Sequence, residues 1–269
     1  METRAEEKWI TCFERVFEMS GVASGDLVGI LSESLSRPVL VELADRGLQR
    51  RGARVVRIQV PTPPLKEPVP VRSTGSTTAF EGYDDLLSGL GGCSLVVDCT
   101  VEGLLHAKER DVLLQAGTRV FMISNEHPEI LERCMPDPGL QPKVDQALAM
   151  LSGASTMQVT SDAGTDLQVN VADAPTRGGA GFLGPEDKVA YWPAGLCLCF
   201  PLENSVNGKV VLDVGDVNLT FKRYVESPVT FHIEKDYVTA IEGTGLDAEL
   251  LRSYYAGWND PLAYTVSHV

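Results

Sequence analysis

The chain has 269 residues, of which 43% are hydrophobic and 22% charged, a balance typical of folded globular proteins and not of disordered or fibrous ones. Its 37 acidic residues outnumber 23 Lys and Arg, and the resulting net charge of −14 repels nucleic-acid phosphates and anionic membranes. No signal peptide, apolar run of membrane-spanning length or Cys-x-x-Cys spacing is present, so we expect a cytoplasmic protein that binds neither nucleic acid nor membrane.

The first half of the chain alternates predicted strands and helices. Apolar residues recur at helical spacing over 5–19 and from Pro38 to about Gly52, where the proline suits a first helical turn. Strands are predicted at 26–31, 53–60, 93–99 and 118–124, with further helices at 84–90 and 104–116. Because strand–helix–strand units cross over into parallel sheets, we predict an α/β domain with an open, mostly parallel sheet over residues 1–150.

After residue 152 the pattern changes to strands in which apolar and polar residues alternate. These strands are predicted at 156–160, 166–171, 209–217, 229–233 and 237–241, followed by a helix at 247–255. We therefore predict a β-rich α+β domain over residues 151–269. A cleft between the two domains is the expected place for a ligand site.

Common catalytic motifs such as HExxH, the P-loop and GxSxG are absent from the sequence. One GxGxxG stretch begins at Gly179, but it follows a loop and precedes Pro185, so it lacks the context of a dinucleotide site. We interpret it as a flexible loop. Cys197 and Cys199 have no second Cys or His pair nearby, which favours buried packing over metal binding.

The four histidines differ in what their positions predict. His232 alternates with apolar residues on a strand and is expected on the exposed face, and His127 is expected in a turn. His106 follows a predicted strand at the carboxyl edge of the sheet, where ligands of open α/β folds gather, so both a site role and a structural role stay open. His268 is next to the last residue, and from this position alone we expect it to belong to a frayed tail.

Motifs spread along the whole chain point to one family. They lie at 95–98, 104–106, 116–119, 128–131, 192–201, 208–216, 233–243 and 259–268. Together they resemble the 2,5-dihydroxypyridine 5,6-dioxygenases, which open a ring in nicotinic acid breakdown and share a fold with the aminopeptidase T (M29) metallopeptidases. The resemblance implies a non-haem Fe(II), extradiol-type dioxygenase that converts a dihydroxylated pyridine or similar aromatic and O₂ to an N-formylmaleamate-type product. It also implies a homo-oligomer.

Two positions separate the branches of this superfamily. The peptidases carry metal-binding glutamates where this chain has Leu196 and His268, and the dioxygenases have an iron-binding histidine at the second position. A metallo-aminopeptidase is therefore disfavoured, and the resemblance implies that His268 binds iron. It also implies that His106, after the same Leu-Leu pair, exchanges a proton with the substrate, and that Tyr191 and Trp192 lie at the substrate.

The chain also departs from the family pattern. Tyr191 replaces a family histidine, and the loop 178–182 lacks an expected acidic residue, which implies a different ring substrate, a different proton-transfer arrangement or lost activity. The family's remaining iron ligands, a His-x-Asp pair, belong to a portion beyond the position of Val269. We therefore expect an incomplete or naturally shortened chain, with an inactive paralogue that binds a small ligand as the alternative.

Overall fold

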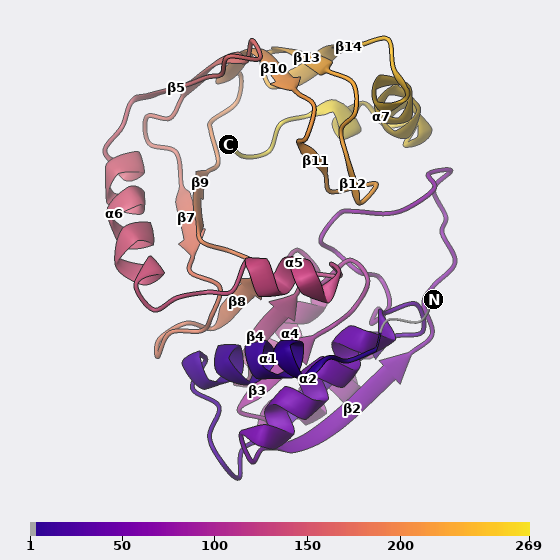
Figure 1. The fold of residues 1–269 in the computed structure, drawn as a ribbon, viewed down its shortest axis with the longest axis vertical. Helices are drawn as coiled ribbons and strands as arrows, with labels where there is room; N and C mark the ends of the chain where they lie inside the picture. Colours follow the sequence, from indigo (N-terminus) through magenta and orange to yellow (C-terminus); the bar gives the residue numbers. More distant parts are fainter. Residues whose placement is uncertain (1–3) are drawn as a thin grey trace. The chain divides into compact units, whose positions relative to one another are not determined.

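The computed structural model describes residues 4–269, which divide into two compact units (Figure 1). The first comprises residues up to 64, 73–141 and 179–196, and the second comprises 65–72, 142–178 and 197–269. Each unit is thus discontinuous in sequence, unlike the consecutive ranges 1–150 and 151–269 that the sequence predicts. One reason is that a strand late in the chain pairs with the sheet of the first unit.

The first unit is built on a five-stranded parallel sheet in the order β2-β1-β3-β4-β8. Its strands are β1 (Leu27–Glu33), β2 (Arg54–Val60), β3 (Leu95–Asp98), β4 (Arg119–Ile123) and β8 (Val189–Trp192). Strands β1 and β3 are buried almost throughout, as expected where both faces of a parallel sheet are covered. The first four strands are confirmed predictions. The sequence did not predict β8, which has only four residues and pairs with a strand more than 60 residues earlier.

Helices cover both faces of this sheet. Their bounds are α1 (Glu7–Met19), α2 (Pro38–Arg50), α3 (Asp84–Ser88), η1 (Gly89–Gly92), α4 (Glu109–Gln115) and α5 (Pro128–Arg133). Apolar residues of α1 and α2 form one core cluster with Trp192, and those of α3, η1 and α4 form another with Leu31 and Val96. The lack of a side chain at Gly47 allows α1 and α2 to pack closely, since a Cβ at this position would lie only 2.9 Å from the Cβ of Phe13.

The second unit is built on a five-stranded antiparallel sheet in the order β14-β13-β10-β6-β5. Its strands are β5 (Thr156–Thr160), β6 (Asp166–Asn170), β10 (Val206–Leu212), β13 (Val229–Glu234) and β14 (Tyr237–Glu242). Buried and exposed residues alternate along β6 and β13, so one face packs on the core and the other is solvated. The alternating pattern in the sequence therefore predicted the five strands, although β10 begins three residues and ends five residues earlier than the predicted 209–217.

Two further helices, a 3₁₀ helix and two strand pairs complete the described structure. They are α6 (Leu140–Ser152), α7 (Leu246–Gly257), η2 (Pro261–Tyr264) and two strand pairs, β7 (Thr176–Gly179) with β9 (Leu196–Cys199) and β11 (Val217–Asn218) with β12 (Arg223–Tyr224). The fold is thus mixed α/β, with one parallel sheet and antiparallel pairing elsewhere. None of the helices among residues 4–269 combines the length and apolar composition needed to cross a bilayer.

A buried carboxylate fastens α7 to the segment before β13. Asp247 Oδ2 accepts the backbone N–H groups of Glu226 at 2.9 Å and of Ser227 at 3.0 Å, and the Ser227 hydroxyl at 3.1 Å. These hydrogen bonds hold the pKa of Asp247 below its usual range, since they favour the ionised form.

Replacing Asp247 with asparagine should lower the free energy of unfolding at pH 7 by about 1–3 kcal/mol, the usual cost of buried polar groups that lose a partner. A carboxyl with a lowered folded-state pKa stabilises the protein above its unfolded-state pKa, and this contribution disappears as pH falls through the folded-state value. Urea unfolding from pH 7 to pH 3 measures both effects. The difference in free energy of unfolding between the wild type and Asp247→Asn should shrink as the pH falls, and a difference that grows would contradict this explanation.

Candidate active site

Tyr191 lies at the carboxyl end of the parallel sheet, on the face covered by α3 and α4. It is in register with Met122 of β4, which is in register with Asp98 of β3, and residues side by side in parallel strands project to the same face. His106 follows β3 in a loop that covers this same face, because its neighbour Leu104 belongs to the core cluster there. His106 and Tyr191 thus share one end and one face of the sheet, as the edge position of His106 predicts.

The imidazole of His106 is exposed and lies against a second loop. Its backbone N–H donates to the carbonyl oxygen of Gly75 at 2.8 Å. Gly75 has a φ of +68°, and a Cβ at this position would lie only 2.9 Å from the Cδ2 atom of His106. Glycine is therefore required both for the backbone conformation and for the close approach of the loop to the ring.

Two buried acidic residues lie beneath these loops, and the sequence analysis did not single them out. Glu33 ends β1 with 2% of its surface exposed, and Asp98 ends β3 with none exposed. Burial raises the pKa of Asp98, partly offset by hydrogen bonds from Thr100 and Leu104, and the nearby Glu33 raises it further. A sequence signal was present, since each acid ends an apolar strand at the sheet edge where ligands gather.

Tyr191 is half-buried, and burial raises the pKa of its phenol, so the hydroxyl stays protonated at neutral pH. A Cβ at Gly179 would lie 3.8 Å from the phenol oxygen, so this glycine lies beside the ring. The prediction of a flexible loop is wrong for Gly179. It ends β7, and its carbonyl oxygen accepts the N–H of Gly195 at 2.8 Å, a pairing that local composition does not reveal.

Trp192 projects to the opposite face of the sheet from Tyr191. Its ring is 1% exposed and lies 5.0 Å, centroid to centroid, from that of Phe13. Its Nε1–H donates to the carbonyl oxygen of Cys134 at 2.9 Å. The structure therefore places Trp192 in the core cluster of α1 and does not bring it together with Tyr191 and His106.

His268 belongs to the second unit and is not part of a frayed end. Val269 and Cys199 exchange two backbone hydrogen bonds of 2.9 and 3.1 Å, and the N–H of Val266 donates to Asp236 O at 2.8 Å. The His268 ring is exposed, lies 5.9 Å from the Phe200 ring, and places Nδ1 2.8 Å from the Ser267 hydroxyl. A hydrogen bond at Nδ1 leaves Nε2 as the nitrogen for a metal or substrate.

The side chains that the structure describes do not complete a metal site. Among residues 4–269, no group of three or more His, Cys, Asp or Glu side chains could hold a metal ion. Cys199 is fully buried in an apolar cluster, where burial raises the pKa of its thiol, so the prediction of packing is confirmed for this residue. His127, expected in a turn, is the N-cap of α5, where its Nδ1 accepts the N–H of Glu129.

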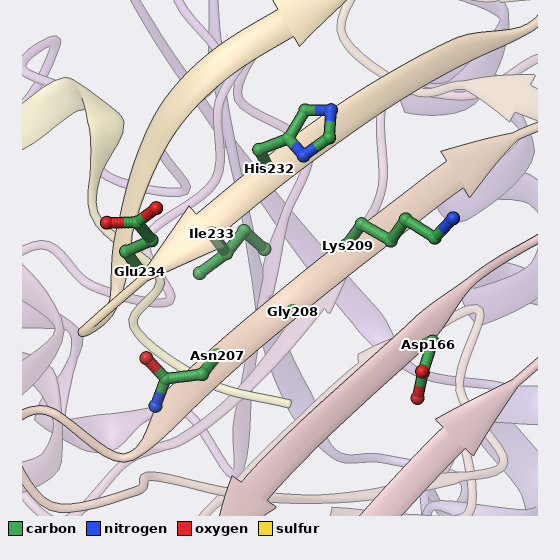
Figure 2. Close-up of a pocket in the computed structure, with 7 residues that line it drawn as sticks. All are labelled: Asp166, Asn207, Gly208, Lys209, His232, Ile233 and Glu234. Carbon is green, nitrogen blue, oxygen red and sulfur yellow. The ribbon is translucent and has the colours of Figure 1, made fainter.

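A pocket of about 390 Å³ lies on the outer face of the antiparallel sheet (Figure 2). Lys209 of β10 lies in register with Asp166 of β6 and with His232 of β13. His232 Nε2 is also 3.1 Å from the Glu242 carboxylate. These polar side chains are those expected on the solvated face of such a sheet, which agrees with the predicted outward direction of His232.

Comparison with known proteins identifies relatives of the chain along nearly its whole length. A family model described as 2,5-dihydroxypyridine 5,6-dioxygenase matches residues 8–269. The 2,5-dihydroxypyridine 5,6-dioxygenase of Pseudomonas putida KT2440 is 34% identical over 264 residues, which cover 96% of this chain and 73% of that protein. The motifs that resemble this family are thus supported by an independent match.

Solved structures agree with this relationship. The structure of 2,5-dihydroxypyridine dioxygenase from P. putida KT2440 matches with a TM-score of 0.80 and 32% identity, over 97% of this chain and 74% of that one. Wild-type AmpT from Thermus thermophilus matches with a TM-score of 0.55 and 16% identity, over 97% and 77%, which shows a shared fold only. The chain belongs to the 2,5-dihydroxypyridine 5,6-dioxygenase family.

Proposed function

We propose that the protein is a dioxygenase that opens the ring of a dihydroxylated pyridine, or of a closely similar aromatic, with O₂. The observation that carries this proposal is the family match over residues 8–269. The residues at the carboxyl end of the parallel sheet support it, since an exposed imidazole and a protonated phenol there suit a hydroxylated ring.

Within this function, His106 is the proton acceptor and donor. Its ring is exposed, and histidine is the side chain that most readily gains and loses a proton near neutral pH. A hydroxyl of the substrate must lose its proton as electron density moves toward O₂, and the product must regain one. His106 takes the proton at a ring nitrogen and returns it.

Tyr191 acts as a hydrogen-bond donor to a ring oxygen of the substrate. Because burial raises the pKa of its phenol, it is not suited to act as a base at neutral pH. Replacement of the family histidine by this phenol therefore changes which substrate oxygens are recognised. His106 remains the candidate for proton transfer.

The metal of this chemistry is Fe(II). Two histidines and one carboxylate with open positions form the ligand set of non-haem Fe(II) oxygenases. Residues 4–269 do not fit a complete set of this kind. His268 is the one ligand that we assign to this chain, on the strength of its ordered backbone and its available Nε2.

Replacing His268 with alanine should weaken Fe(II) binding by more than about 10-fold, since even changes outside the ligand set commonly cost 10–100-fold. Anaerobic calorimetry with Fe(II) on the longest expressible form measures the affinity. His232→Ala is the matched control, because this histidine lies on the solvated face of the antiparallel sheet. Equal losses in both variants, or none in His268→Ala, would remove His268 as a ligand.

Oxygen uptake tests the proposed function directly. The longest expressible form, loaded anaerobically with Fe(II), should consume one O₂ for each 2,5-dihydroxypyridine lost. Hydrolysis of aminoacyl amides with Zn²⁺ or Co²⁺, without an iron requirement, would favour a peptidase. Failure to bind stoichiometric metal or to consume O₂ would favour the inactive, ligand-binding paralogue.

A further inference from the structure

The buried acid at the end of β3 shapes the loop that carries His106. Asp98 Oδ1 accepts the backbone N–H of Thr100 at 2.9 Å and its hydroxyl at 2.7 Å, while Oδ2 accepts the N–H of Leu104 at 2.6 Å. The Thr100 hydroxyl in turn accepts the N–H of Gly103 at 3.1 Å. One carboxylate therefore closes residues 98–104 into a defined turn, two residues before His106.

The buried acid at the end of β1 joins this turn to the second loop. Glu33 Oε1 accepts the backbone N–H of Val101 at 2.8 Å and the hydroxyl of Thr77 at 3.1 Å. Thr77 is 3% exposed, and its hydroxyl also accepts the N–H of Ala79 at 3.1 Å. Glu33 thus holds both loops through a single oxygen atom.

Two hydrogen bonds between backbone groups also join the two loops, one of them at His106 itself. The N–H of Thr77 donates to Gly103 O at 2.8 Å, and the N–H of His106 donates to Gly75 O at 2.8 Å. Since Gly75 lies directly against the His106 ring, a displacement of the loop at Thr77 changes the surroundings of the ring.

Carboxylates suit this arrangement because they only accept hydrogen bonds, and five donors from the loops converge on two of them. An amide at position 98 would turn its NH₂ group toward at least one backbone N–H. An amide at position 33 can keep its oxygen at the Oε1 position and loses only the charge. The two acids therefore differ in the tolerance expected of their isosteric variants.

We propose that Glu33 and Asp98, with Thr77 as the link between the loops, are positioning residues for the imidazole of His106. This inference rests on the proposed function of the chain. The residues touch no substrate, and they act by fixing the two loops between which the ring is presented.

The test compares Thr77→Val, which removes the hydroxyl at nearly constant shape, with Thr77→Ser, which retains it. In ¹H–¹³C spectra of protein labelled at histidine, the chain gives one Cε1–H signal for each of its four histidines, and His106→Gln assigns the relevant one. The His106 signal should shift in Thr77→Val and Asp98→Asn, return in Thr77→Ser, and change much less in Glu33→Gln, which keeps an oxygen at the Oε1 position. In Fe(II)-loaded protein, kcat should fall about 10-fold or more in Thr77→Val, with KM within about twofold, and recover in Thr77→Ser.

Asp247→Asn is the control for loss of a buried carboxylate, because Asp247 accepts three hydrogen bonds in the second unit. It should lower the unfolding midpoint and leave the His106 signal and kcat in place. An unshifted His106 signal in folded Thr77→Val and Asp98→Asn, or an equal shift in Asp247→Asn, would overturn the inference. A different outcome concerns the proposed role of His106. If the loop variants shift the His106 signal but His106→Gln still opens the ring at the wild-type rate, that role is overturned and the positioning of the ring is not.

Discussion

Replacing His106 with glutamine should lower kcat for ring opening by about 10²–10⁴-fold, the usual contribution of a positioned acid–base group. Glutamine keeps a polar side chain of similar length but cannot take up and return a proton near neutral pH. Because the imidazole is exposed, the free energy of unfolding should change little. Steady-state oxygen uptake with 2,5-dihydroxypyridine, together with urea unfolding, measures both quantities.

The control for this prediction is His232→Gln, which alters a histidine on the solvated face of the antiparallel sheet. It should retain wild-type kcat. If His106→Gln also retained wild-type kcat, the proton would have to be accepted elsewhere, and the carboxyl end of the parallel sheet would lose its assigned role.

Replacing Trp192 with alanine should lower the free energy of unfolding by about 3–5 kcal/mol, the range for large aromatic residues removed from a core. The ring is 1% exposed and packs against Phe13, and its loss also leaves Cys134 O without the indole N–H. Trp192→Phe preserves most of the packing and should cost clearly less. Urea unfolding of the wild type, Trp192→Phe and Trp192→Ala measures their free energies of unfolding, which should fall in that order.

The same pair of variants separates a core role from the substrate contact that the family resemblance implies. In a core role, Trp192→Phe lowers stability and leaves KM for 2,5-dihydroxypyridine unchanged. A raised KM in Trp192→Phe with wild-type stability would place the indole at the substrate and contradict the packing described here.

Much of the fold could be predicted because its signals are local. Helical spacing identified α1 and α2, and alternating apolar residues identified β6, β13 and β14. Strands β7 and β8 were missed because each has only four residues, and β8 also pairs with β4, more than 60 residues earlier in the chain. Missing β8 had a consequence for the site, since adjacent residues of a strand project to opposite faces. Because Tyr191 and Trp192 are adjacent in β8, their side chains lie on opposite faces of the sheet, which the sequence analysis did not foresee.

For the candidate site, a general rule predicted a position. The sequence placed His106 at the carboxyl edge of the parallel sheet, and the structure has it there. The roles of Glu33 and Asp98 depend on which loop N–H groups meet their carboxylates, and this is decided by tertiary contacts. The order at His268 likewise comes from pairing between Val269 and Cys199, which are 70 residues apart, so composition alone suggested a frayed end.

Isotope labelling provides the most direct test of ring-cleaving dioxygenation. The Fe(II)-loaded protein is given 2,5-dihydroxypyridine under ¹⁸O₂, and the product is examined by mass spectrometry. We predict a ring-opened product that carries both atoms of one O₂ molecule. A product that takes its new oxygen from labelled water, or no product that depends on O₂, would contradict it.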